Sequence, residues 1–192
     1  LAAMSAATLQ ALNPDVDVWL GVGVSAPGIL SQHGMPTTDK PIGMMREYVA
    51  LFRECLSGES VTFEGDYFQT KRFRLGMRLG ERKPKIVMAA LNPQMLKLAG
   101  EVADGVLLNY LPSSHVQPSI DQVRKGGTAK IFAYVHASVT EFERGAKSAK
   151  KDLFNYVMAD GYAKMFKEAG FGEEVDEIRA LQKQKNRDGA VD

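Results

Sequence analysis

The sequence predicts an α/β fold in which helices pack around a parallel sheet. Short, near-continuous apolar runs rich in Val, Ile and Leu are typical of strands buried on both faces. Segments with apolar residues at helical spacing separate these runs, and Gly, Pro or Asn stands at most of the joints. This alternation predicts βαβ units with right-handed crossovers. We expect the 192 residues to form a single domain.

The first quarter of the chain contains a helix, a strand, a loop and a second helix. Residues 4–12 are expected to be helical and to end before Asn13 and Pro14. A Val-rich run closed by glycines predicts a strand at 17–24. Residues 25–40 show no periodicity, which predicts a long loop. A further helix is expected to open at Pro41 and run to Leu56.

Residues 57–84 are expected to form an insertion segment outside the main sheet. Within it, residues 61–68 predict an extended segment or hairpin near the rim, with Gly65 at the turn. A basic stretch follows, which we interpret as a solvated surface loop, although a grip on a phosphate or a polyanionic tail is an alternative. Its cations are Lys71, Arg72, Arg74, Arg78, Arg82 and Lys83.

The second half of the chain continues the alternation. Strands are expected at 86–90, 105–109 and 130–137, with a helix at 93–102 after the first of them. Residues 110–127 predict a loop and a short helix. The residues after the last predicted strand are expected to be helical and to end in a polar, frayed tail. These helices are expected at 146–158, 162–169 and 173–184, before a tail at 186–192.

Composition excludes several classes of protein. Lys plus Arg is 24 against 23 Asp plus Glu, so nothing indicates a nucleic-acid or anionic-membrane partner. No apolar run approaches the ~20 residues of a membrane span. The single cysteine, Cys55, lies in an apolar helical pattern; we expect it to be buried, in a protein of the reducing cytoplasm. Three scattered histidines, His33, His115 and His136, predict no metal site.

Ligands of parallel α/β folds bind at the carboxyl ends of the strands, and this rule selects four segments. The most informative begins at Ala90, where Asn92 is a favourable N-cap and Pro93 suits the first helical turn. The free N–H groups of Gln94 and Met95 would then bind a phosphate, unless this is a plain capped helix. The other segments are residues 23–25, 109–112 and 136–138.

Gly21 and Gly23 resemble half of a dinucleotide-binding fingerprint, but the third glycine is out of step. We interpret these glycines as allowing a flat ring to approach the backbone.

Four stretches, in the same order, resemble the luciferase-like monooxygenase family, and are most similar to its branch that uses the deazaflavin coenzyme F420. The resemblance covers roughly residues 5–112. The stretches are residues 20–25, residues 33–36 with Pro41 and 46–48, residues 61–68, and residues 88–105.

The resemblance implies a (β/α)₈ TIM barrel of the bacterial-luciferase type. The strand at 17–24 would be the fourth of the barrel and the strand at 130–139 the seventh, so the barrel is incomplete here, with the first three strands and the last absent. The resemblance also implies a cofactor site formed by Gly23, Val24, Ser25, Ala90, Leu91, Asn92, Gln94 and Met95. Asn109 and His33 would lie on the substrate side, and no catalytic acid or base is assigned.

Three functions remain open at this point. The resemblance favours an enzyme that transfers a hydride between F420 or a flavin and a small organic substrate. The alternatives are an FMN-dependent monooxygenase and a non-catalytic flavin-binding or structural barrel fragment. A homo-oligomer is expected, because family members associate and because an incomplete barrel leaves sheet edges to cover.

Overall fold

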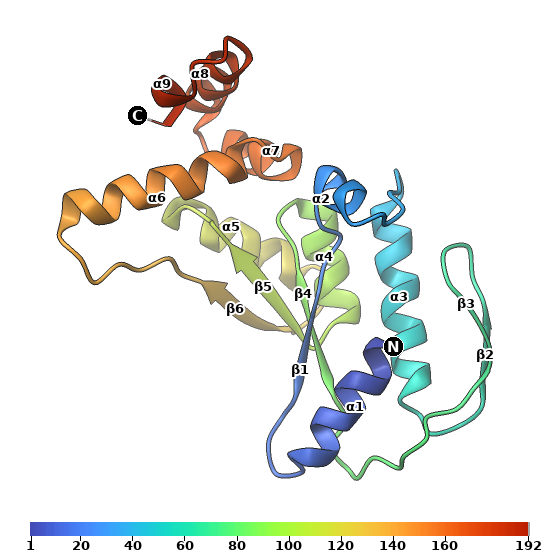
Figure 1. The fold of residues 1–192 in the computed structure, drawn as a ribbon. Coiled ribbons are helices and arrows are strands. Elements are labelled where there is room, and N and C mark those ends of the chain that lie inside the picture. The colour runs from blue at the N-terminus through green and yellow to red at the C-terminus, as the bar shows by residue number, and fades with distance from the viewer. Residues whose placement is uncertain (192) are drawn as a thin grey trace.

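A four-stranded parallel sheet organises the computed structural model, which describes residues 1–191 (Figure 1). Its strand order is β1-β4-β5-β6, and each neighbouring pair runs parallel. The strands are β1 (Trp19–Val22), β4 (Lys85–Ala89), β5 (Gly105–Asn109) and β6 (Lys130–Tyr134). The predicted α/β fold with a parallel sheet is therefore confirmed.

The two outer strands are shorter than their apolar runs. The strand predicted at 17–24 pairs only from Trp19 to Val22, and the strand predicted at 130–137 ends at Tyr134. Within residues 1–191 each has a neighbour on one side only, so its ladder stops where that neighbour stops. β5, which has a neighbour on both sides, has its predicted bounds.

One face of the sheet is covered by α1 (Ala2–Leu12), α3 (Pro41–Cys55), α4 (Pro93–Val102) and α5 (Ser113–Arg124). Alternate strand residues point into this layer and form the main core with the apolar sides of the helices. Cys55 is buried there as expected, and burial raises the pKa of its thiol. The fully enclosed side chains include Val49, Ile86, Met88, Leu96, Leu98, Val106 and Val123.

The opposite face of the sheet carries an aromatic layer near the amino ends of the strands. The rings of Trp19 and Phe132 meet edge to face, with centroids 5.0 Å apart. Gly105 lies between them, and a Cβ there would be 2.6 Å from the Phe132 ring and 3.1 Å from Trp19. Further along the same face, towards the carboxyl ends of β1 and β4, the small residues Gly21, Gly23 and Ala89 are exposed.

A pair of antiparallel strands, β2 (Val61–Glu64) and β3 (Gln69–Phe73), forms a separate sheet beside α3 (Figure 1). Lys71 and Arg72 belong to β3, which corrects the loop predicted there. Just beyond the hairpin, Leu75 is buried in the main core. That residues 57–84 form an insertion segment outside the barrel proper stays a prediction.

Two short helices were missed by the sequence patterns. The predicted loop at 25–40 contains α2 (Pro27–Gln32), which starts at a proline and has no buried residue. The tail that was expected to fray contains α9 (Arg187–Val191), where Ala190 is 4% exposed. A contact with α6 holds α9 in place, because the Arg187 guanidinium lies over the Phe154 ring at 5.4 Å.

The last four helices, α6 to α9, form a second layer with its own small core, which we call the helical cap. α6 (Phe142–Val157), α7 (Asp160–Glu168) and α8 (Gly172–Lys183) start one to four residues before their predicted positions. Figure 1 shows α6 and α7 above the carboxyl ends of the strands. The core of this helical cap comprises Val157, Ala163, Met165, Phe166 and Val175. None of the helices in residues 1–191 has the length and apolar character needed to cross a membrane.

Candidate functional site

The carboxyl ends of the four strands meet at one edge of the sheet, below α6 and α7. This arrangement brings together the loop that follows Gly23, the segment from Ala90 to Met95, and the residues that follow Asn109. The strand order makes the ends of β4 and β5 direct neighbours. The predicted segments therefore lie along one edge of the sheet, with residues 23–25 and 136–138 at its two ends.

Helix α4 begins at this edge with unused backbone donors. Asn92 is its N-cap residue with extended backbone angles, and Pro93 is its first helical residue. The first ladder bond of the helix runs from the Leu96 N–H to the Asn92 carbonyl at 2.9 Å. The N–H groups of Gln94 and Met95 precede that bond and point out of the helix end. Together with the positive end of the helix dipole they suit an anion such as phosphate.

The Asn92 side chain does not cap its helix, which corrects one part of the sequence prediction. Its Nδ2 instead donates to the carbonyl oxygen of Gly161, in the first turn of α7, at 3.2 Å. Its Oδ1 is buried and has no hydrogen-bond partner among residues 1–191. An unpaired buried acceptor costs about 1–3 kcal/mol. Because this oxygen is not exposed, a bound molecule would reach it only if neighbouring side chains moved.

Small residues flank this anion site on the open face of the sheet. A Cβ added to Gly23 would lie 3.3 Å from the Cβ of Ala89, whereas one added to Gly21 would meet nothing within 4 Å. Both glycines and Ala89 are exposed. They form a strip without large side chains; its use by a planar ring stays a prediction.

Two non-glycine residues at this edge adopt left-handed backbone conformations. Ser25, shortly after β1, has φ of 62°, and Tyr110, directly after β5, has φ of 53°. Such conformations cost on the order of 1–3 kcal/mol and concentrate at functional sites. Two more non-glycine residues with positive φ, Arg72 and Lys185, lie away from this edge, so the strain is not confined to it. No local signal in the sequence predicts it for Tyr110.

Asn109 ends β5 and bonds to the helical cap. Its Nδ2 donates to the hydroxyl oxygen of Tyr162 on α7 at 2.6 Å. Burial raises the pKa of Tyr162, against a smaller lowering by the Asn109 bond. The phenol consequently stays protonated near neutral pH. Tyr162 was not singled out from the sequence, where it is only one apolar position of a helical pattern.

A second polar group links β5, β6 and α6. The Tyr110 hydroxyl donates to Oδ2 of Asp152 at 2.5 Å, and Nδ1 of His136 lies 3.5 Å from the same oxygen. The rings of Tyr110 and His136 are 3.8 Å apart between centroids. Burial, followed by the bond to Asp152, raises the pKa of Tyr110. His136 and Asp152 line an open cavity of about 720 Å³ between α6 and the segment that follows β6.

His33 does not join this group. It is the exposed C-cap residue of α2, and no hydrogen bond or ion pair links it to the strand ends within residues 1–191. Its role on the substrate side stays a prediction. Among residues 1–191, no three His, Cys, Asp or Glu side chains lie close enough together to hold a metal ion.

Comparison with known sequences connects this geometry to a family. The sequence model of the luciferase-like monooxygenases matches residues 1–192. A 5,10-methylenetetrahydromethanopterin reductase of Methanolobus tindarius is 28% identical over 168 residues, which are 82% of this chain and 51% of the relative. An F420-dependent glucose-6-phosphate dehydrogenase of Tsukamurella paurometabola is 34% identical over 111 residues, covering 55% and 32%. The chain thus spans about half the length, or less, of these relatives.

Solved structures share the fold. The coenzyme F420-dependent tetrahydromethanopterin reductase from Methanopyrus kandleri superposes with a TM-score of 0.75 at 20% identity, covering 98% of this chain and 61% of that one. The monooxygenase RslO1 from Streptomyces bottropensis gives a TM-score of 0.60 at 19% identity, over 92% and 56%. The helical cap is therefore part of the shared fold, since the first match extends over nearly the whole chain.

Proposed function

Because the chain belongs to the luciferase-like monooxygenase family, we propose that it forms the cofactor-binding part of an oxidoreductase that uses the deazaflavin F420. Its fold is part of the TIM-barrel type found in the structural neighbours. The reaction we propose is hydride transfer between F420 and a small organic substrate. The names of the reductase and dehydrogenase relatives support this choice over the wider family.

The observation that carries the proposal is the start of α4 beside the strip of small residues. Gln94 and Met95 offer backbone donors for the cofactor phosphate at the start of α4. Gly23 and Ala89 leave room for the ring. Val24, Ser25 and Leu91 would complete this cofactor site, and Asn109 would face the substrate side. The side chain of Ala90, which is 3% exposed, belongs to the main core instead.

In this proposal, the residues of the chain position the cofactor and supply fixed dipoles around it. A bound deazaflavin supplies the hydride chemistry. The α4 terminus neutralises phosphate charge with aligned N–H groups and no lysine in its first turn. Asn109 and Tyr162 present an oriented amide and phenol at the end of β5.

An FMN-dependent monooxygenase is the second candidate. The family description and the likeness to RslO1 favour it. FMN also carries a flat ring, a hydroxylated chain and a phosphate, so the same residues would bind it. The phosphate site alone does not separate the two cofactors.

Titration with each cofactor tests the proposal. The protein is titrated with F420 and separately with FMN, and ligand fluorescence is followed to saturation. We expect F420 to bind at least about tenfold more tightly than FMN, a difference of 1.4 kcal/mol. Tighter binding of FMN would contradict the F420 assignment in favour of the second candidate. Absence of saturable binding of either cofactor would contradict both.

A further inference from the structure

The phenol of Tyr162 is held at the strand ends with its hydroxyl proton unused. Its oxygen accepts the Asn109 amide at 2.6 Å. Its ring packs edge-on against Tyr156, with centroids 4.7 Å apart, and is tilted against Phe166 at 6.4 Å. These contacts fix both the ring and the direction of the oxygen. The side chain of Tyr162 therefore has a fixed orientation, unlike a side chain that is free in solvent.

A phenol oxygen that accepts one hydrogen bond still has its own proton to donate. Among residues 1–191 no acceptor receives the proton of Tyr162. Burial also keeps the hydroxyl protonated, because it raises the pKa of Tyr162. The side chain thus offers a donor, and not a base, to whatever lies next to it.

The position of Tyr162 indicates which part of a ligand this donor meets. The preceding residue, Gly161, accepts the amide of Asn92 at the N-cap of α4, where the phosphate site begins. Asn109 ends the neighbouring strand β5. Tyr162 consequently stands one step from the phosphate site along the edge of the sheet. In flavins and in deazaflavins, a hydroxylated carbon chain joins the phosphate to the ring.

We propose that Tyr162 donates a hydrogen bond to a hydroxyl oxygen of the chain that links the cofactor ring to its phosphate, with Asn109 as the positioning residue. The inference rests on the proposed function and adds a binding residue from the helical cap. With this bond, α7 would line the cofactor site. The site would then combine residues that lie more than 50 positions apart in the sequence. Hydroxylated flavins and deazaflavins are the ligand class that it recognises.

Two ligands that differ only in the chain separate this role from a structural one. Riboflavin carries the hydroxylated chain, whereas lumiflavin has the same ring with a methyl group in its place. Dissociation constants of both are measured by flavin fluorescence for the wild type and for Tyr162→Phe. The same comparison is made with the riboflavin-like and methyl forms of the deazaflavin ring. Tyr48→Phe is the control, because Tyr48 is also partly buried and packs edge-on against Phe68, away from the strand ends.

We expect Tyr162→Phe to weaken binding of the chain-bearing ligand about tenfold, and to change binding of the methyl form less than twofold. Tyr48→Phe should change neither. Equal weakening of both ligands would overturn the inference, because the phenol would then act on the ring or on packing. Unchanged binding of both would overturn it as well. Failure of the wild type to bind any flavin or deazaflavin would contradict the proposed function itself, and is distinguished by the wild-type titrations alone.

Discussion

The side chain of Asn92 joins two helices instead of capping one. Its amide nitrogen reaches the α7 carbonyl of Gly161, and its buried oxygen has no hydrogen-bond partner among residues 1–191. A carbonyl only accepts hydrogen bonds, so the nitrogen must face Gly161 and the oxygen must face away. The residue therefore fixes how the helical cap sits beside the anion site.

Replacing this amide tests its part in cofactor binding. We expect Asn92→Ala to weaken binding of F420 by about 1–2 kcal/mol, because a bond that orders the site is lost. Stability should change little, since the unpaired acceptor is removed together with the bond to Gly161. Titration and thermal melting measure the two effects. Asn13→Ala, which removes an exposed amide that donates to the Leu9 carbonyl before the amino end of β1, is the control; equal affinities in the two variants would contradict the prediction.

Sequence patterns located site residues whose role depends on their immediate neighbours in the sequence. They missed residues that reach the strand ends from distant parts of the chain. Asn92 and Pro93 form a helix start within a few residues, and the structure has a helix start there. Tyr162 and Asp152 reach the strand ends from 53 and 42 positions away, through the packing of α6 and α7. Nothing in their own neighbourhood distinguishes them from ordinary helix residues.

At the scale of elements, one carboxylate attaches the β2–β3 hairpin to α3. Glu47 accepts the backbone N–H groups of Asp66, Tyr67 and Phe68 at 2.9, 2.9 and 2.5 Å. Gly65 occupies the predicted turn, but not because of a left-handed backbone, since its φ is not positive. A Cβ at this position would overlap the Glu47 carboxylate.

Two substitutions test this attachment. We expect Glu47→Gln to lower the free energy of unfolding by about 1.5–3 kcal/mol, the range for hydrogen bonds to a charged group. Gly65→Ala should have a similar effect, because the methyl group displaces the carboxylate. Urea denaturation provides the measurement, with Gly80→Ala as the control, since a Cβ there meets nothing within 4 Å. A Gly65→Ala protein as stable as Gly80→Ala would refute the explanation.

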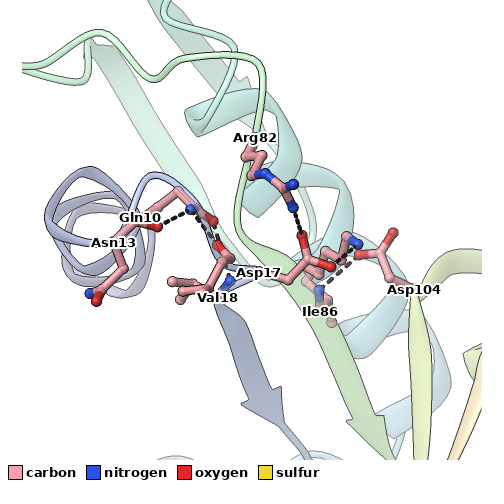
Figure 2. Close-up of polar contacts among 9 residues, drawn as sticks. Gln10, Asn13, Asp17, Val18, Arg82, Ile86 and Asp104 are labelled. Carbon is pink, nitrogen blue, oxygen red and sulfur yellow. Dashed lines mark hydrogen bonds and ion pairs between the residues drawn. The ribbon is translucent and has the colours of Figure 1, made fainter.

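Ion pairs fasten the amino ends of β1 and β4. Asp17 lies 2.5 Å from Nζ of Lys85 and 3.0 Å from the Arg82 guanidinium (Figure 2). Beside it, the Ile86 N–H donates to Asp104 at 2.8 Å, and the buried amide of Gln10 holds the turn before β1. The hydrogen bond from Lys85 is the largest cause that lowers the pKa of Asp17 below 3.8.

The depressed pKa sets the sign of a pH effect. A carboxylate whose pKa is lower when folded contributes stability above its unfolded pKa, near 3.9, and loses it as the pH falls through the folded value. We therefore expect Asp17→Asn to be less stable than the wild type at pH 7. The two should converge as the pH falls through the folded pKa of Asp17. Urea midpoints measured between pH 7 and pH 2.5 check this, and a difference independent of pH would contradict it.

Among the elements, those with strong burial were predicted best. α4 and β5 have the predicted bounds, because α4 has a marked apolar side and β5 is paired on both sides. α2 has no buried residue, so no periodic apolar signal marks it. α9 is held by Arg187 against Phe154, a contact that no local pattern contains.

At the scale of the whole molecule, the sheet has two open edges within residues 1–191. β1 and β6 each pair on one side only, and Tyr134 and Val135 at the end of β6 are 56% and 76% exposed. Unpaired edges with apolar side chains promote pairing with another chain. The structure itself contains a single chain, so association is a prediction.

Light scattering tests whether these edges associate. We expect this chain to form a homo-oligomer, and we expect Val135→Lys to shift it towards monomer, because a charge at a strand end opposes edge pairing. Multi-angle light scattering after size exclusion gives the mass directly. A monodisperse monomer of the wild-type chain would contradict the prediction.

The central claim is that the start of α4 binds the cofactor phosphate through backbone donors. The most direct measurement is the dissociation constant of F420, and of FMN, for Gln94→Pro, which removes one of these N–H groups outright. Glu173→Pro is the control, since it removes the corresponding first-turn donor from α8. We predict at least about thirtyfold weaker binding for Gln94→Pro, more than 2 kcal/mol, with circular dichroism like that of the wild type and the control. A folded Gln94→Pro protein that binds both cofactors as tightly as the wild type would show that the phosphate does not bind at this helix.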